Sequence, residues 1–209
     1  MNELKDLMSN GNKKIGKDTL IFNIGTATNC LNRKLGICTI KNCYALKAEK
    51  QYPQVLPYRE RQEKYFKNTS YIDILFNLKD ILSSKRKPIK YIRINESGDF
   101  KSQKEIDKIY KMAEHFKEIV FYFYTKSFSY LDFNKNKPKN VRVIYSYNNY
   151  FEYIQYKEVK QKAFIFINKI MDIKEIQKNI KGSVICKGNC RTCNYCKVTK
   201  PLKVLVKSH

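Results

Sequence analysis

The sequence predicts an α/β protein in which mostly parallel strands alternate with helices. Short apolar runs recur along the chain, and most carry β-branched or aromatic residues at successive positions. That pattern is typical of strands covered on both sides. Amphipathic segments separate several of the runs, and such alternation builds βα units. We therefore expect a small, irregular (β/α) barrel of the TIM type, with an open sheet as the alternative.

Seven strands and five main helices are expected. The strand ranges are 19–25, 89–95, 119–125, 141–147, 163–168, 183–186 and 202–207. The helix ranges are 57–68, 71–85, 102–117, 150–162 and 172–181. Ser102 and Glu105 have the spacing of a capping box, and Gly182 fits a helix C-cap. Because no repeat, low-complexity segment or linker interrupts the pattern, residues 1–209 are expected to form a single domain.

The charge of the chain points to a polyanionic partner. Lys and Arg total 42 against 19 Asp and Glu, which gives a net charge of +23. Such an excess attracts nucleic acid. Codon drift in an AT-rich genome could exchange Arg for Lys, but it does not explain the excess of bases over acids. Since the basic residues are spread along the chain, we expect a folded face that binds DNA or RNA. Sequence specificity should be weak, because arginines that could read bases are few.

The compartment is expected to be the cytoplasm. The chain has no run of 18 apolar residues, and its first residues do not resemble a signal peptide. We therefore expect no membrane partner. In a reducing compartment, seven cysteines indicate metal binding or catalysis more often than disulfides.

The cysteines fall into two groups, one in the loop 30–43 and one in the segment 183–197. Each group follows a predicted strand, so both are expected at the carboxyl ends of the strands, where barrel active sites gather. The last three form C-x2-C-x2-C, which is similar to the three-thiolate run of bacterial ferredoxins. A tight loop with two intervening residues can reach successive irons of a cubane. The expected metal ligands are Cys30, Cys38, Cys43, Cys186, Cys190, Cys193 and Cys196.

An iron–sulfur cluster is therefore the expected cofactor, in the simplest case a four-iron, four-sulfur (4Fe-4S) cluster. Zinc held by the four C-terminal thiols is an alternative, and free thiols are another. Seven thiols exceed one cubane and fall one short of two. Either Cys186 joins the N-terminal three, leaving the last three on a cluster with an open iron, or one cluster draws on both groups.

Four polar residues near two strand ends are further site candidates. Alternation along "YIRINESGDF" directs Arg93 and Asn95 away from Ile92 and Ile94. If they face the barrel mouth, they need partners; the structural alternative is an Arg93–Asp99 pair with a helix cap. Lys126 in "FYFYTKS" has the character of an anion site, or is one lysine among many. Their catalytic roles stay unassigned.

A tyrosine-rich stretch, 145–153, could stack nucleic-acid bases, which favours single strands over duplex as the partner. An ordinary strand end followed by a helix start accounts for it equally well.

Three stretches together resemble one known family. They are "TNCLNRKLGICTIKNCYALK", "RINESGDF" and "FYFYTKS". With the closing cysteines, they resemble the phage and plasmid proteins called gene product 88, over roughly residues 19–197. The resemblance implies an origin in a mobile element and an iron–sulfur barrel, but it implies no particular reaction.

A looser similarity links the chain to radical S-adenosylmethionine enzymes, which bind a cubane after the first strand of a partial barrel. The N-terminal cysteines have the spacing C-x7-C-x4-C, which differs from the compact C-x3-C-x2-C of that superfamily. "NESGD" follows the second predicted strand in place of a GGE-type segment. These departures argue against S-adenosylmethionine as a cofactor.

Three functions stay open on the sequence alone. The first is an iron–sulfur barrel protein that binds nucleic acid through a basic face. The second is a radical or redox enzyme that uses an open cluster iron. The third is a zinc-stabilised DNA-binding protein without catalysis.

Overall fold

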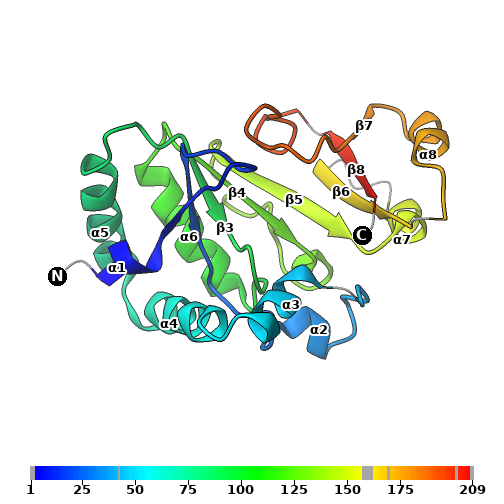
Figure 1. Cartoon of the computed structure of the whole chain (residues 1–209). Helices are drawn as coiled ribbons and strands as arrows, with labels where there is room; N and C mark the ends of the chain where they lie inside the picture. The colour runs from blue at the N-terminus through cyan, green and yellow to red at the C-terminus, as the bar shows by residue number, and fades with distance from the viewer. Residues whose placement is uncertain (1–2, 42, 157–161, 169, 201, 208–209) are drawn as a thin grey trace.

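A computed structural model describes residues 3–41, 43–156, 162–168, 170–200 and 202–207. Its strands form one eight-stranded sheet (Figure 1). They are β1 (Ser9–Asn10), β2 (Thr19–Phe22), β3 (Tyr91–Ile94), β4 (Val120–Thr125), β5 (Val141–Tyr147), β6 (Lys162–Ile167), β7 (Ser183–Ile185) and β8 (Lys203–Lys207). Their order across the sheet is β1-β2-β3-β4-β5-β6-β8-β7. Only the pairing of β1 with β2 is antiparallel among the ladders of the described residues.

The predicted α/β class with a mostly parallel sheet is confirmed, whereas a closed barrel is not seen. β1 and β7 are the two edges of the sheet, and no ladder among the described residues joins them. All seven predicted strands are present within a few residues of their expected ends. The short strand β1 was not expected, because two residues carry no periodic signal.

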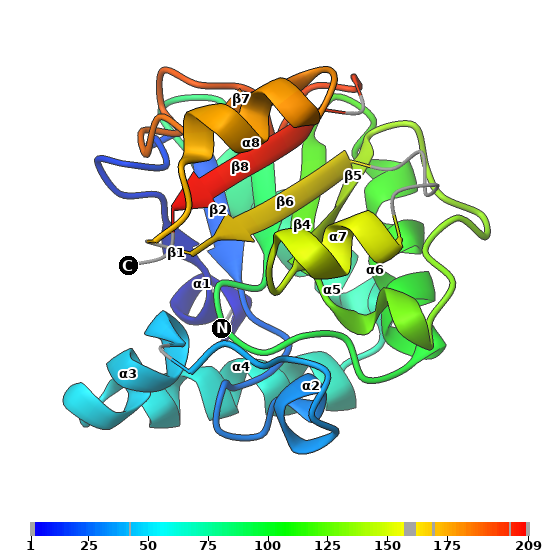
Figure 2. The ribbon, with the colours of Figure 1, turned by 90° about the vertical axis from the view of Figure 1, so that its right-hand side faces the viewer.

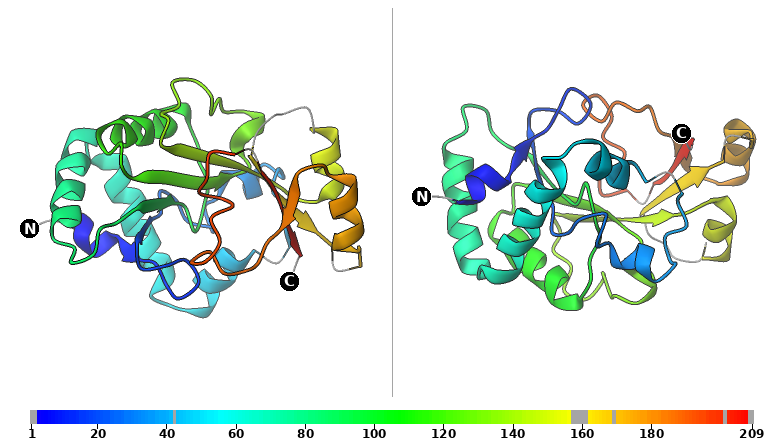
Figure 3. Two further views of the ribbon diagram at one scale, coloured as in Figure 1. Left: turned by 90° about the horizontal axis from the view of Figure 1, so that it is seen from above. Right: turned by 60° about the horizontal axis from the view of Figure 1, so that its bottom comes forward.

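The helices pack mainly on one face of this sheet (Figure 3). They are α1 (Glu3–Leu7), α2 (Leu31–Lys34), α3 (Tyr44–Gln51), α4 (Val55–Asn68), α5 (Tyr71–Ser83), α6 (Gln103–His115), α7 (Tyr150–Gln155) and α8 (Ile173–Asn179), with a 3-10 turn η1 (Ser127–Ser129). Apolar side chains of α1, α4, α5 and α6 share one buried core with those of β2 to β6. None of the helices in the described part of the chain is both long and apolar enough to cross a bilayer.

Two helix predictions need correction. Helix α7 ends at Gln155, and residues 157–161 of the helix predicted over 150–162 lie outside the described residues. The predicted capping box does not form, because the Ser102 side chain makes no cap hydrogen bond. Glu105 instead accepts a hydrogen bond from the backbone N–H of Lys101, at 2.6 Å. Gly182 does have a positive φ, +74°, just beyond α8.

Alternation along the strands divides the sheet into two chemically different faces. Ile92 and Ile94 of β3 point into the helix-covered core, together with Phe121 and Phe123 of β4. Arg93, which pairs with Tyr122, points to the opposite face. We call this opposite face the loop face; along β3 to β6 it presents Arg93, Tyr122, Tyr124, Arg142, Ile144, Lys162 and Phe164.

The loop face is partly covered by the chain segment that joins β7 to β8. These parallel neighbours need a crossover connection, which is usually a helix, but residues 186–200 contain no helix. The segment is held at several points. Its Arg191 N–H donates to the Lys14 carbonyl at 2.9 Å, and the Lys162 ammonium donates to the Tyr195 and Lys200 carbonyls at 2.7 and 2.8 Å. Figure 2 shows the segment beside loop 11–18, which precedes β2.

Candidate metal centre and its surroundings

The C-terminal cysteines lie within the β7–β8 crossover, and three of them are electrostatic neighbours. Burial raises the pKa of the Cys196 thiol to about 11, and the nearby Cys190 and Cys186 thiols add to that shift. Burial also raises the pKa of Cys190, again with Cys186 as a contributor. Cys193 is half-buried in the same segment, between Cys190 and Cys196. All seven cysteines of the chain are free thiols.

A backbone hydrogen bond to sulfur marks the start of this group. The Gly188 N–H donates to Cys186 Sγ at 3.4 Å. Gly188 adopts φ +71°, a left-handed conformation that favours glycine. Hydrogen bonds to sulfur tune metal-bound thiolates, and the Gly188 N–H would be such a donor if Cys186 bound a metal.

The described thiols are not arranged as a site for a single metal ion. In the described part of the chain, no three Cys, His, Asp or Glu side chains converge closely enough to hold one. Tetrahedral zinc requires four sulfurs at about 2.3 Å from one ion. A cubane spreads its thiolate ligands further apart, because each binds a different iron. The grouping of Cys186, Cys190 and Cys196 is therefore not a preformed zinc site.

Cations without carboxylate partners surround these thiols. Lys162 is buried, and burial lowers its pKa to about 8. Lys197 is also buried, and its ammonium lies 3.9 Å from the centroid of the Tyr91 ring. Among the described residues, neither lysine nor Arg93 forms an ion pair. Because an unpaired buried charge is costly, the loop face favours an anionic group beside it.

Arg93 has unused hydrogen-bonding capacity on the loop face, as does Arg142, whose buried Nε also has no partner. The guanidinium of Arg93 lies 5.5 Å from the centroid of the Tyr124 ring, and one terminal nitrogen is 3.4 Å from the Tyr44 hydroxyl. Its buried Nε has no partner. The positive charge of Arg93 also lowers the pKa of Cys190 against the effect of burial. Arg93 thus faces the C-terminal thiols and makes no ion pair with Asp99.

The N-terminal cysteines occupy a different place, at the carboxyl ends of the strands. Cys30 precedes α2 and is buried, whereas Cys43 precedes α3 and is half-buried. Burial raises the pKa of Cys30 to about 11, and the Asp99 carboxylate and the Cys38 thiol contribute in the same direction. The thiols that influence one another's pKa therefore belong to the same group in each case.

Asp99 anchors the N-terminal cysteine loop. Its carboxylate accepts hydrogen bonds from Asn32 Nδ2 at 2.8 Å, Thr125 Oγ1 at 2.8 Å and the Lys126 N–H at 2.7 Å. Asn32 also donates to Ser127 Oγ at 3.0 Å. Burial raises the pKa of Asp99. The donors that surround its carboxylate indicate that Asp99 holds neighbouring segments together. The network joins the "SGDF" and "YTKS" stretches to the loop that carries Cys30 and Cys38.

One family matches the chain over nearly its whole length. A family model described as gene product 88 matches residues 5–198, a range that includes both cysteine groups. The chain belongs to the gene product 88 family. No curated protein and no solved structure matches it. None of the comparisons supports the looser similarity to radical S-adenosylmethionine enzymes.

In this member of the gene product 88 family, the other two strand-end candidates are separate from the C-terminal thiols. Asn95 has φ +65°, and its side-chain oxygen accepts a hydrogen bond from the Ile24 N–H at 3.0 Å. It therefore joins the ends of β2 and β3 and does not lie beside Arg93 as expected. Lys126 is buried on the loop face, where its ammonium donates to the Ser146 carbonyl at 2.8 Å. Burial lowers the pKa of Lys126.

Sequence reasoning missed the polar residues that hold this family's motifs together. Glu49 of α3 accepts hydrogen bonds from the Ala27 N–H at 2.8 Å, Ser97 Oγ at 2.7 Å and Arg59 at 3.0 Å. Burial alone would raise the pKa of Glu49, but the hydrogen bonds from Ala27, Ser97 and Thr28 together lower it. Glu49, Arg59 and Asn32 are all nearly inaccessible. The sequence did not mark Glu49 or Arg59 as buried, because 29% of the chain is charged and most charged residues are exposed.

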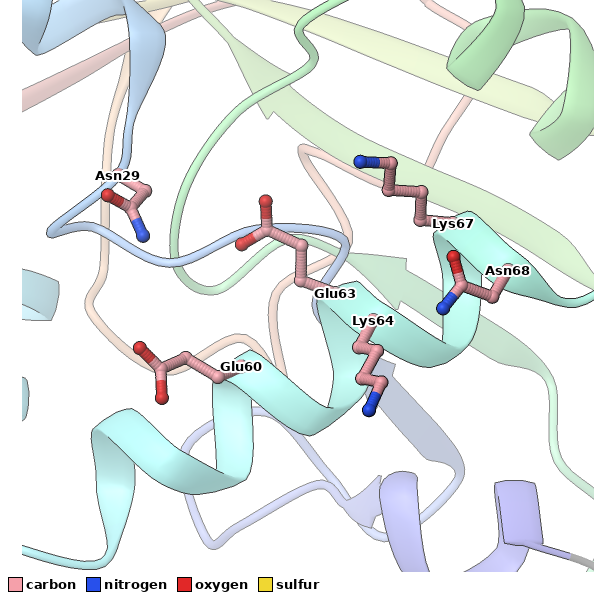
Figure 4. Close-up of a pocket in the computed structure, with 6 residues that line it drawn as sticks. All are labelled: Asn29, Glu60, Glu63, Lys64, Lys67 and Asn68. Atoms are coloured by element: carbon pink, nitrogen blue, oxygen red, sulfur yellow. The ribbon is translucent and has the colours of Figure 1, made fainter.

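A hollow on the outside of α4 offers no alternative site. Figure 4 shows its lining, which is Asn29, Glu60, Glu63, Lys64, Lys67 and Asn68. It contains no cysteine and none of the strand-end candidates. Its acidic and basic side chains are mixed, and Glu63 already pairs with Lys101. We assign it no function.

Proposed function

We propose that this gene product 88 protein holds an iron–sulfur cluster, 4Fe-4S in the simplest form, on the β7–β8 crossover. The residues that would hold it are Cys186, Cys190, Cys193 and Cys196. When bound, such a cluster supplies one-electron redox chemistry, a structural cross-link, or both. The protein's own contribution is to position the thiols, to compensate their charge and to restrict access of water.

The observation that carries this proposal is the chemistry of the crossover itself. A parallel connection normally buries the apolar stripe of a helix, but this one contains no helix and only a few apolar residues. A cluster would supply the missing cross-link. Arg93, Lys162 and Lys197 lie beside it without ion-pair partners in the described structure, and thiolates on a cluster would offset their charge.

A second candidate, an S-adenosylmethionine-dependent reaction, is favoured by one specific observation. The N-terminal cysteines lack the compact C-x3-C-x2-C spacing, but Cys186, Cys190 and Cys193 have it. If these three alone held the cluster, one iron would be open, and Cys196 would be the spare thiol. Titration of S-adenosylmethionine into the reduced, cluster-loaded protein tests this candidate through a change in the electron paramagnetic resonance spectrum.

We further propose that the protein binds nucleic acid through a basic face. The support is its net charge of +23 on a folded chain. Zinc in place of the cluster, with nucleic-acid binding and no catalysis, is the remaining alternative.

The test of the cluster proposal is an absorption spectrum of protein purified without oxygen, together with two cysteine variants. We expect a brown protein with broad absorption near 400 nm, as is usual for iron–sulfur proteins. Cys190→Ser should lose this absorption, whereas the matched variant Cys38→Ser should keep it. Equal loss in both variants would mean that one cluster draws on both cysteine groups. Retention in both would exclude the crossover as the site.

A further inference from the structure

We infer that the amino edge of the sheet binds the phosphate backbone of duplex nucleic acid. The amino edge is defined here as the segments that precede β2, β3, β4, β5 and β8. Their ranges are 11–18, 84–90, 116–119, 134–140 and 191–200. This inference rests on the proposed nucleic-acid binding and adds to it a surface and a class of partner.

Charge is concentrated at this edge. The five segments contain 14 Lys or Arg against two acidic residues, Asp18 and Glu118, and so carry a net +12 of the chain's +23. The four segments that follow β2 to β5, with the ranges 23–43, 95–102, 126–132 and 148–149, contain five Lys or Arg against three Asp or Glu. For β2 to β5 alone, the preceding segments carry a net +9 (11 Lys or Arg against two acids) and the following segments a net +2, so the two ends of these strands differ sharply in charge.

The basic side chains of the amino edge are exposed and close together. Those classed as exposed are Lys13, Lys14, Lys17, Arg86, Lys87, Lys90, Lys117, Lys135, Lys137, Lys139, Arg191 and Lys200. Backbone hydrogen bonds tie neighbouring segments to each other, such as Lys90 N–H to the Asp18 carbonyl and Val120 N–H to the Lys90 carbonyl, both at 2.9 Å. Figure 1 shows loop 11–18, the loop before β3 and the crossover at the top of the view, away from α2 and α3.

The size of the edge suits a duplex. From β2 to β8 there are five inter-strand spacings, which correspond to about 24 Å of sheet. A duplex carries one phosphate charge per ~1.7 Å of its axis, so a duplex of this length has about 14 phosphates on its two strands, of which those on the near side face the edge. The crossover that carries Arg191 and the C-terminal cysteines forms part of the edge, which brings the candidate cluster next to the bound backbone.

None of the aromatic side chains in the described residues of the amino edge is exposed, since Phe116 and Tyr195 are half-buried. This favours duplex over the single strands that the tyrosine-rich stretch suggested. Tyr145, Tyr147 and Tyr153 of the tyrosine-rich stretch are buried. Its exposed aromatic residue, Phe151, follows the carboxyl end of β5. Without an aromatic platform, single strands gain little from base stacking.

An anionic membrane is a poorer partner than a duplex for the same edge. Within its described residues, Val198 is the sole exposed large apolar side chain. A surface that binds lipid bilayers normally inserts several apolar side chains. The exposed Lys and Arg side chains of this edge suit contacts with phosphates.

The experiment compares two triple variants that lower the net charge equally. Lys17→Glu/Arg86→Glu/Lys87→Glu changes the amino edge. The control, Lys47→Glu/Lys50→Glu/Lys64→Glu, changes exposed lysines on α3 and α4. Fluorescence anisotropy measures binding of the full chain to a 20-base-pair duplex and to its single strand, from about 50 to 200 mM salt. Wild-type affinity for the duplex should fall steeply and log-linearly with salt.

The amino-edge variant should lose about tenfold or more in duplex affinity, and its salt slope should fall by about three units, one for each phosphate contact removed. The control should stay close to wild type. Equal losses in both variants, or tighter binding to the single strand, would overturn the inference while leaving nucleic-acid binding intact. Absence of wild-type binding to either probe at low salt would defeat the proposed nucleic-acid function itself. Binding to phosphatidylserine vesicles without binding to the duplex would assign the edge to a membrane.

Discussion

At the scale of single residues, the loop face gives each of its cations a distinct task. Lys162 and Lys197 hold the crossover, through two carbonyls and through the Tyr91 ring. Arg93 keeps a buried N–H without a partner. A buried donor without an acceptor costs about 1–3 kcal/mol. Arg142 shares this feature, but Arg93 is the one whose charge acts on the Cys190 thiol, so Arg93 would be the donor to the sulfur atoms of the proposed cluster.

The ligand role of Cys193 leads to a prediction about stability. Cys193→Ser should bind less iron, and the melting temperature of the anaerobic protein should fall by about 5 °C or more. The reason is that a cluster bound only by the native state adds its binding free energy to folding. After removal of iron by a chelator, wild type and variant should melt together. Unchanged iron content and melting temperature in Cys193→Ser would exclude it as a ligand.

Gly98 is predicted to be essential where "NESGD" meets the end of β2. It has φ +72°, and a Cβ there would lie 2.7 Å from the carbonyl carbon of Gly25. Gly98→Ala should therefore lower the free energy of unfolding by about 3 kcal/mol or more, from backbone strain and overpacking together. Gly182→Ala is the matched control, because Gly182 has φ +74° and a Cβ added there would meet no atom within 4 Å. It should cost only about 1–2 kcal/mol in urea unfolding, and equal losses would contradict the packing argument.

The sequence predicted which face of the sheet a side chain would occupy better than it predicted which residues would be its hydrogen-bond partners. Alternation along β3 correctly placed Arg93 opposite Ile92 and Ile94. The partners of Asn95 and Asp99 were not predictable, because they come from Ile24 and Asn32, far away in the sequence. Asn95 left the expected alternation because its positive φ turns the chain immediately after β3.

At the scale of elements, Glu49 joins α3 and α4 to the ends of β2 and β3. Its folded-state pKa is lowered, and an unfolded glutamate titrates near pH 4.3. The stabilisation from the ionised carboxylate is therefore fully present above about pH 4.3 and is lost as the pH falls through the lower, folded-state value. Glu49→Gln should be less stable than wild type at pH 7, and this difference should shrink below about pH 4.

Urea unfolding across pH 3–7 measures this effect. Glu114→Gln, at an exposed position on α6, is the control and should follow wild type throughout. A stability difference between wild type and Glu49→Gln that does not change with pH would contradict the linkage. Such a result would mean that Glu49 stabilises the fold through packing and hydrogen-bond geometry and not through its charge.

The elements themselves were largely predictable, while their connections were not. Apolar runs of four to seven residues identified β2 to β8, because all of these strands except the half-buried edge strand β7 contain buried residues. The order of the strands in the sheet could not be predicted, because β8 lies between β6 and β7 and no local sequence pattern encodes these pairings. The same insertion makes the cysteine segment a crossover, which spacing alone could not indicate.

At the scale of the whole molecule, the sheet separates the two cysteine groups. The N-terminal cysteine loop and the Asp99 network lie at the carboxyl ends of the strands. The C-terminal cysteines lie on the loop face in a segment tied to loop 11–18 at the amino edge. Total charge predicted a basic face but not its location, because location depends on which loops the parallel strands bring together. The open sheet likewise follows from edge strands that do not meet.

The central claim is that the crossover cysteines hold an iron–sulfur cluster, and the metal and sulfide content of the protein tests it most directly. Iron, zinc and acid-labile sulfide should be measured per chain after anaerobic purification, and again after anaerobic reconstitution with iron and sulfide. The account predicts about four iron and four sulfide per chain for one 4Fe-4S cluster, with all of it lost in Cys190→Ser. One zinc per chain without sulfide, or no metal even after reconstitution, would contradict it.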